Sequence, residues 1–198
     1  MNAQSTRVGR QKILDVAESL FTEHGYQAVS IRQIAQACGL TNAALYYHFD
    51  SKEALYKEVL EHYTARLGQR MREAAAGHRT IREQVVAILI AYVDLVASRR
   101  SLFFALRHRP AGMSKEEAHQ HHAQLFHTVL APLEDALQRA VEQEELQALP
   151  DDYSAASLLL GMLHGLIRYR HACHQADIDQ KDVRTITNTF WYGMVGQS

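Results

Sequence analysis

Residues 30–49 read SIRQIAQACGLTNAALYYHF, and this stretch decides how the N-terminal part of the chain folds. It holds two short segments with apolar residues at helical spacing, separated by a turn that begins with Gly39. Ser30 and Gln33 stand at the spacing of a capping box, which predicts the start of the first helix. Thr41 is typical of the residue that caps the second helix. Two short helices joined by a glycine-containing turn form a helix-turn-helix.

The second of these helices, predicted over residues 42–49, has few side chains that can pack in a core. Leu45 and Phe49 are its apolar pair, and its other faces carry small, polar and aromatic residues. A DNA recognition helix needs small residues where it approaches the groove, and alanine methyl groups can contact thymine methyl groups. The composition therefore favours a helix that grips DNA over a helix that carries an active site.

The rest of the chain is also predicted to be helical, because no segment alternates apolar and polar residues as a half-buried strand would. The preceding helix carries an apolar stripe from Ile13 to Phe21 and ends near Gly25. Pro132 is expected to kink or split the long helix in which it lies. The helices predicted after the helix-turn-helix cover residues 52–76, 80–98, 101–107, 114–145, 151–174 and 181–195.

The chain is long enough for one large domain or for a small domain joined to a larger one, and its composition predicts a cytoplasmic protein. We expect a helix-turn-helix DNA-binding domain over residues 1–52 and a helical domain over residues 53–198. No apolar run approaches the roughly 18 residues of a membrane span, and residues 1–12 lack the apolar stretch of a signal peptide. Cys38 and Cys173 are the two cysteines, which fits a reducing compartment without disulfides. The net charge of −1 excludes DNA binding by bulk positive charge, so a few placed residues must make the contacts.

The stretch from Arg10 to Leu60 resembles the N-terminal domain of the tetracycline-repressor (TetR) family. The resemblance rests on A-x-x-L-F-x-x-x-G-Y at residues 17–26, S-I-R-Q-I-A at residues 30–35 and L-Y-Y-H-F-x-S-K-E-x-L at residues 45–55. Outside this stretch the chain resembles the family only in length and helical layout. By analogy with the family, the resemblance implies an all-α chain of about nine helices, a larger C-terminal ligand-binding and dimerisation domain, and an Ω-shaped homodimer.

The resemblance also assigns DNA contacts to residues of the helix-turn-helix. Phosphate contacts fix the register of a protein on DNA without reading sequence. The residues that would make them are Ser30, Thr41, Tyr47, His48 and Lys52. The residues that would reach the bases or the groove are Arg32, Gln33, Asn42, Ala43 and Tyr46. Arg32 is the best candidate to read guanine, because the second helix of the motif carries no lysine or arginine. The Gln33 side chain could instead be occupied by the capping box.

The function that these features imply is a DNA-binding transcriptional regulator, most simply a repressor that a small-molecule ligand releases from a pseudo-palindromic operator. Its partners would be double-stranded operator DNA, a second copy of the chain and an unidentified small-molecule effector, with no cofactor and no membrane contact. The family resemblance implies an effector pocket between the fourth and eighth helices. The candidate lining residues mix aromatic and polar side chains, as pockets usually do: Tyr92, Phe103, Phe104, Arg107, Phe126, His127, His164 and Arg168.

A homodimer is expected because operator half-sites one helical turn apart require two copies of the motif. The last two helices are the natural interface, since Gly161 and Gly165 would let helices approach closely. The other interface candidates are large apolar residues: Leu158, Met162, Phe190, Trp191 and Met194. The alternative is an ordinary pair of core helices within one chain.

Two other classes of protein remain as alternatives. An enzyme is not expected, because the sequence has neither G-x-S-x-G nor a P-loop, and Tyr47 beside His48 lies on a short helix with no implied cleft. A metal-binding protein would use the histidines, since spacings of three residues could place two ligands on one metal. The candidates are His119, His121, His122, His127, His171 and His174, the last two beside Cys173. No H-E-x-x-H pattern accompanies them, so no metal site is predicted, and protonation of the same cluster at about pH 6 is a further alternative.

Overall fold

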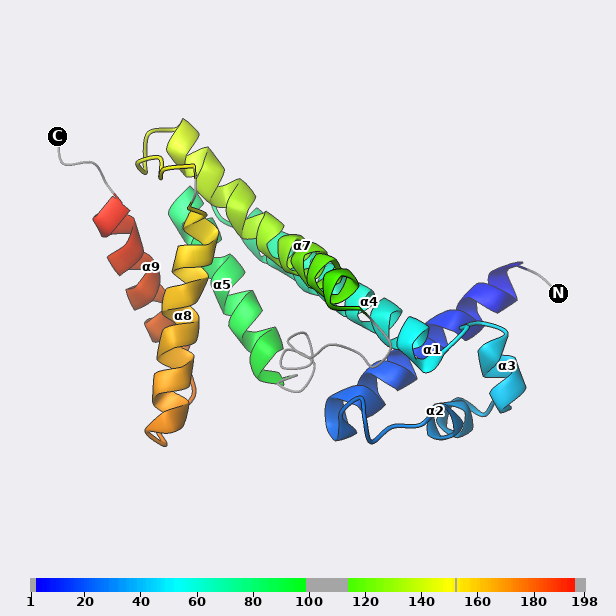
Figure 1. Cartoon of the computed structure of the whole chain (residues 1–198). Helices are drawn as coiled ribbons and strands as arrows, with labels where there is room; N and C mark the ends of the chain where they lie inside the picture. The colour runs from blue at the N-terminus through cyan, green and yellow to red at the C-terminus, as the bar shows by residue number, and fades with distance from the viewer. Residues whose placement is uncertain (1–2, 99–113, 152, 195–198) are drawn as a thin grey trace. The chain divides into compact units, whose positions relative to one another are not determined.

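The computed structural model describes residues 3–98, 114–151 and 153–194, and every regular element within these ranges is an α-helix (Figure 1). The helices are α1 (Ala3–His24), α2 (Ile31–Cys38), α3 (Asn42–Tyr46), α4 (Lys52–Ala76), α5 (Ile81–Ser98), α7 (Lys115–Glu142), α8 (Ala155–Ala172) and α9 (Gln180–Met194). The predicted all-α fold is confirmed, while the helix predicted over residues 101–107 lies outside the described ranges. None of the helices described is both long and apolar enough to cross a membrane.

The chain packs as two compact units. The first comprises Met1–Arg66 with Val96–Phe126, and the second comprises Leu67–Leu95 with His127–Ser198, as far as these ranges are described. Helices α4 and α7 each contribute residues to both units. The predicted domain boundary after residue 52 stays a prediction, and the first turns of α4, which begins there, belong to the first unit.

The first unit has a small apolar core to which α1, α2, α3 and the first turns of α4 all contribute. Phe21 of α1 and Tyr56 of α4 meet edge to face, with ring centroids 5.2 Å apart. Burying one such side chain stabilises the fold by about 1.5–3 kcal/mol. The residues buried in this core include Ile13, Phe21, Ile34, Leu45, Phe49 and Tyr56.

Local signals set the path of the helix-turn-helix. Gly39 ends α2 in the left-handed conformation, at φ 72°, which costs a glycine little. Helix α3 is shorter than predicted, because the amides of His48 and Phe49 both donate to the carbonyl of Leu45, at 2.9 and 3.1 Å. This tight turn brings Phe49 into the core after the helix has ended. The Ser51 hydroxyl then accepts the Ala54 amide at 3.0 Å at the start of α4.

The second unit combines α5, α8 and α9 with the later turns of α4 and α7. Helices α8 and α9 lie side by side (Figure 1), and Arg170 of α8 pairs with Asp182 of α9. Helix α8 begins at Ala155, later than predicted, because Ser154 rather than the Pro150 segment caps it. The buried residues of this unit include Leu89, Leu133, Leu159, Leu163, Val183 and Thr187.

Helices α4 and α7 approach closely within the second unit, at Gly68. A Cβ atom built on Gly68 would lie 3.0 Å from the carbonyl oxygen of Thr128 on α7. Pro132 lies four residues after Thr128 and has no N–H to donate to that carbonyl. The proline does not split α7, which continues to Glu142. The glycine therefore has a packing role where the two long helices meet.

Gly68→Ala is expected to lower the free energy of unfolding by about 1 kcal/mol, since crowding costs about 1–3 kcal/mol and better helix propensity returns about 1 kcal/mol. Thermal unfolding measures the change. The control is Gly193→Ala in α9, where an added Cβ meets nothing within 4 Å and stability should rise. Equal gains in both variants would contradict the close approach of α4 to α7.

Candidate nucleic-acid interface

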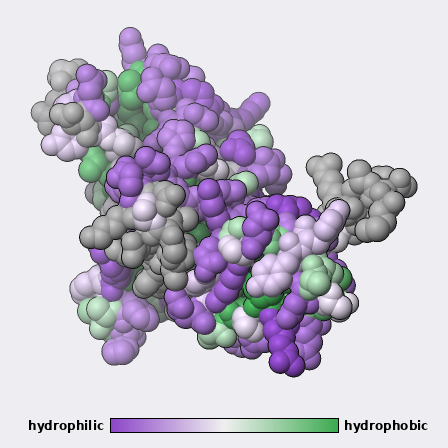
Figure 2. Space-filling view, turned by 45° about the vertical axis from the view of Figure 1, so that its right-hand side comes forward, coloured by the Kyte–Doolittle hydropathy of each residue, from purple (hydrophilic) through white to green (hydrophobic). Residues whose placement is uncertain are grey.

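The residues predicted to contact DNA lie around α2 and α3, mostly on the surface. Tyr46 is the last residue of α3, a helix of five residues, and is 50 % exposed. Tyr47 follows it and is 73 % exposed. In Figure 2 the part of the surface that comes forward at the lower right mixes hydrophilic with pale and apolar side chains. Large exposed aromatic rings contribute little to a core, so they favour a surface that contacts another molecule. The other predicted contacts are also exposed, namely Ser30, Arg32, Gln33, Thr41, Asn42 and Ala43, whereas His48 and Lys52 are half-buried.

The capping residues of α2 and α3 have the predicted geometry. The Ser30 hydroxyl accepts a hydrogen bond from the backbone N–H of Gln33 at 3.3 Å. The Gln33 Oε1 accepts one from the backbone N–H of Ser30 at 2.8 Å, and the two bonds confirm the capping box. The Thr41 Oγ1 accepts the Ala44 amide at 3.1 Å. Because Gln33 uses its oxygen within the cap, its side-chain NH₂ is the group that it can offer to DNA.

Lys52 is held at the start of α4 by Tyr26, a residue that the sequence analysis did not assign to the site. Its Nζ lies 4.1 Å from the centre of the Tyr26 ring, a cation–π contact. The Tyr26 hydroxyl donates to the Glu53 carboxylate at 2.9 Å. Burial and then this carboxylate raise the pKa of Tyr26, so the hydroxyl stays protonated, while burial lowers the pKa of Lys52. The contact fixes the position of Lys52, which is itself a predicted phosphate contact.

Two cations of α1 contact the C-terminal end of α2 and the residues just after α3, and the sequence analysis did not assign them to the site. The Arg10 Nη1 donates to the carbonyl of His48 at 2.7 Å, just after α3. The Lys12 Nζ donates to the carbonyl of Cys38 at 3.0 Å, at the end of α2. Carbonyls at a helix C-terminus lack partners within the helix, so cations are favourable there.

The residues predicted to line an effector pocket are only partly brought together. The Tyr92 hydroxyl of α5 and the His164 Nε2 of α8 lie 2.6 Å apart in the second unit, and Tyr92 is buried. Phe126 is 51 % exposed, and His127 and Arg168 are exposed as well. Phe103, Phe104 and Arg107 lie outside the described residues. The predicted pocket therefore remains a prediction, with one hydrogen-bonded pair of side chains inside the second unit.

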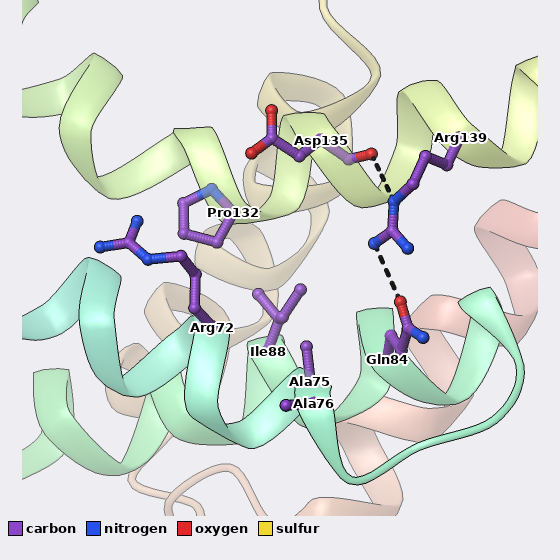
Figure 3. A pocket seen from close by; sticks show the side chains of 8 residues that line it. All are labelled: Arg72, Ala75, Ala76, Gln84, Ile88, Pro132, Asp135 and Arg139. Atoms are coloured by element: carbon purple, nitrogen blue, oxygen red, sulfur yellow. Dashed lines mark hydrogen bonds between the residues drawn. The ribbon is translucent and has the colours of Figure 1, made fainter.

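A cavity of about 250 Å³ in the second unit is lined by other residues. Figure 3 shows Arg72 and Arg139 on opposite sides of it, with Pro132 and Ile88 between them. The Arg139 guanidinium donates to the Gln84 Oε1 at 2.9 Å and to the Asp135 carbonyl at 3.2 Å. Ligand pockets usually enclose about 300–1,000 Å³, so this cavity is small for an effector site.

The predicted dimer residues divide into an exposed group and a buried group. On α8, Leu158 is 43 % exposed and Met162 is 39 % exposed, and Gly161 is exposed between them. Phe190 and Trp191 of α9 are each 6 % exposed in the single chain, and their place in an interface stays a prediction. They pack inside their own chain and have almost no surface to offer a partner. Gly165 and Met194 are half-buried.

The histidines are mostly dispersed over the surface. His119, His127, His171 and His174 are exposed, as is Cys173, and the side chain of His122 is outside the described part. His121 is buried, with its Nδ1 3.9 Å from the Glu61 Oε1. Among the described residues, no three histidine, cysteine or acidic side chains gather in a way that could hold a metal ion.

Comparison with known proteins matches the helix-turn-helix segment to a family. Residues 13–59 match the family model described as bacterial regulatory proteins, tetR family. The chain is 34 % identical over 92 residues to the HTH-type transcriptional repressor KstR2 of Rhodococcus jostii, which is 46 % of this chain and 45 % of KstR2. It is 29 % identical over 171 residues to the HTH-type transcriptional regulator AcrR of Shigella flexneri, which is 83 % of this chain and 79 % of AcrR. The chain thus spans less than half of KstR2 but most of AcrR.

A solved structure shares the fold over the whole length. The TetR family transcription regulator from Marinobacter aquaeolei superposes with a TM-score of 0.72 at 18 % identity, covering 99 % of this chain and 100 % of that chain. At this identity the likeness establishes the fold alone, while the match at residues 13–59 covers the helix-turn-helix itself. The exposed Tyr46 and Tyr47, the capped helices around them and these matches lead to one conclusion: residues 13–59 form a domain of the tetR family of bacterial regulatory proteins.

Proposed function

We propose that this protein is a transcriptional repressor that binds a pseudo-palindromic operator as a homodimer and is released by a small-molecule effector. The observation that carries the proposal is the exposure of Tyr46 and Tyr47. Tyr46 lies on α3 and Tyr47 follows it, and Leu45 is the residue by which α3 packs in the core. Such a helix is built to present side chains outward. In this proposal the protein acts in the cytoplasm, and it acts by binding rather than by catalysis. The second point is supported by its relatives, which are named as a transcriptional repressor and a transcriptional regulator.

The arrangement of the first unit supports the proposed DNA contacts. Asn42, Ala43 and Tyr46 on α3 would enter the major groove, where small residues permit close approach. Tyr47, the Thr41 hydroxyl and Lys52 would contact phosphates on either side, together with the amides at the start of α2. Arg32, which is exposed on α2, is the remaining cation for a guanine contact.

A selection experiment tests the proposal directly. The purified full chain should enrich a pseudo-palindromic duplex from a random DNA pool, and its affinity for that duplex should fall as the salt concentration rises. Because Lys52 is the one lysine or arginine among the predicted phosphate contacts, few phosphates are neutralised, so the salt dependence should be weaker than that of a strongly basic DNA-binding protein. If no sequence is enriched even at low salt, the repressor proposal fails.

Substitutions at Tyr47 and Arg32 separate phosphate contacts from base contacts. Tyr47→Ala should weaken binding to the selected duplex and to unrelated DNA alike, by about 3- to 10-fold, because it removes a contact that carries no sequence information. Arg32→Ala should weaken binding to the selected duplex by about tenfold or more and relax the preference at one base pair. Titrations with both duplexes measure the two ratios, and unchanged affinity in both variants would remove these residues from the interface.

The dimer and the effector complete the proposed mechanism. The exposed stripe on α8 that includes Leu158 and Met162 would pair with the same stripe of a second copy, as isologous interfaces do. An effector can release DNA only if it binds one arrangement of the dimer better than the other. The Tyr92–His164 hydrogen bond joins α5 to α8 in the second unit, so a ligand that inserts between these side chains would act directly on the helix of the proposed interface.

A further inference from the structure

Two ion pairs join α1 to the first part of α4 within the first unit. Arg10 pairs with Glu58, and Glu18 pairs with Arg66. Each pair joins residues 48 positions apart in the chain, so the two helices run in the same direction along each other. The pairs lie about two helical turns apart on α4, and they are of the same chemical kind.

The Arg10–Glu58 pair also contacts the chain immediately after α3. The Arg10 Nε lies 3.1 Å from the Glu58 Oε1, while its Nη1 donates to the His48 carbonyl at 2.7 Å. The same guanidinium lies 4.4 Å from the centre of the Phe49 ring. Arg10 therefore contacts the chain immediately after α3 in two ways, while its carboxylate partner holds it to α4.

The guanidinium is suited to this role because its donors lie in one rigid plane. One edge faces the carboxylate of Glu58, and Nη1 points to the backbone carbonyl of His48. A group with fixed donor directions sets the angle between the two elements that it joins. A flexible ammonium group supplies a point charge and would not fix both directions at once.

We propose that Arg10 is a positioning residue for DNA recognition: it fixes the end of α3 against α4, so that the outward side chains of α3 meet the groove at the right angle. The proposal rests on the proposed function, because it gives Arg10 a part in reading DNA without a contact to DNA. A helix of five residues has little stability of its own, so its orientation depends on the contacts at its ends.

The Glu18–Arg66 pair provides a matched control. Arg10→Ala and Arg66→Ala each remove the arginine of an α1–α4 ion pair, but Arg10 also contacts the residues that follow α3. Both variants are titrated with the duplex that the wild-type chain selects from a random pool and with an unrelated duplex of equal length. The temperature is one at which circular dichroism shows both variants folded.

Arg10→Ala should lose about tenfold or more in affinity for the selected duplex, the scale of one charge-assisted hydrogen bond, and at most about threefold for the unrelated duplex. Arg66→Ala should lower the melting temperature but change both affinities by at most about threefold. Without DNA, the amides of residues 47–49 should exchange hydrogen faster in Arg10→Ala than in Arg66→Ala. Arg10→Lys, which keeps the charge, should lose specificity to an intermediate degree, and it serves as the test variant if Arg10→Ala does not fold.

The possible results separate the alternatives. If both arginine variants lose affinity equally, Arg10 only stabilises the fold and the positioning role is overturned. If Arg10→Ala loses affinity equally for both duplexes, Arg10 acts as a phosphate contact instead. If the wild-type chain selects no duplex, the proposed repressor function fails, and hydrogen exchange at residues 47–49 still decides whether Arg10 holds the end of α3.

Discussion

Replacing Leu45 with alanine is expected to abolish sequence-specific DNA binding and to lower the free energy of unfolding of the first unit by about 2–5 kcal/mol. Leu45 is fully buried and is the buried residue of α3. Its carbonyl also accepts the amides of His48 and Phe49, so its position sets the turn that follows the helix. A five-residue helix is not stable by itself, and without this anchor α3 loses its fixed place.

Tyr46→Ala is the matched control, because Tyr46 is the next residue of the same helix but is half exposed. Circular dichroism should give a melting temperature close to that of the wild type for Tyr46→Ala and a clearly lower one for Leu45→Ala. Titration with the selected duplex should show weakened but measurable binding for Tyr46→Ala, with altered preference among sequences. A Leu45→Ala chain that binds with wild-type affinity would show that α3 is positioned by something other than its core contact.

The helix-turn-helix could be predicted from sequence because its boundaries depend on local chemistry. Ser30, Gln33 and Thr41 cap helices with their own side chains, and Gly39 ends α2 in a conformation that suits glycine. The end of α3 could not be predicted in the same way. Leu45 and Phe49 are spaced for one helix face, and the pattern is equally satisfied when a turn brings Phe49 to the core.

The residues that hold the candidate site together were not visible in the sequence. Arg10, Lys12 and Tyr26 each contact a group between 26 and 48 positions away, and no local pattern marks such contacts. The exposed residues of α2 and α3 could be assigned because family resemblance and helix geometry agree on which sides face outward. The sequence therefore predicts the exposed residues of the site better than the residues that hold α2, α3 and Lys52 in place.

The interface residues show a different limit of sequence analysis. An apolar stripe on a helix predicts burial, but it does not say whether the same chain or a partner supplies the other side. Phe190 and Trp191 are buried by their own chain, whereas Leu158 and Met162 are left exposed. Only the folded chain separates these two groups, and it directs the test of dimerisation to α8.

Leu158→Asp combined with Met162→Asp is expected to convert the proposed dimer to a monomer and to weaken binding to the selected duplex by about a hundredfold or more. The two side chains are 43 % and 39 % exposed on neighbouring turns of α8, so a single chain tolerates aspartate there. In a dimer, each carboxylate would be buried against the same charge of the partner, which is strongly unfavourable. A monomer binds two half-sites as separate events and loses the effective concentration that linkage provides.

Phe126→Asp is the control, because Phe126 is also a large apolar side chain, 51 % exposed, but lies on α7 in the first unit. Analytical ultracentrifugation should give a dimer for the wild type and for Phe126→Asp and a monomer for the double variant. The melting temperature of the double variant should fall no further than loss of the dimer explains. That contribution is measured from the concentration dependence of the wild-type melting temperature, because obligate dimers unfold in a concentration-dependent way. A double variant that remains dimeric would move the interface away from α8. A monomer that binds the selected duplex as tightly as the wild type would show that one helix-turn-helix is enough for tight binding. The dimer is needed for affinity only because it links the binding of two half-sites.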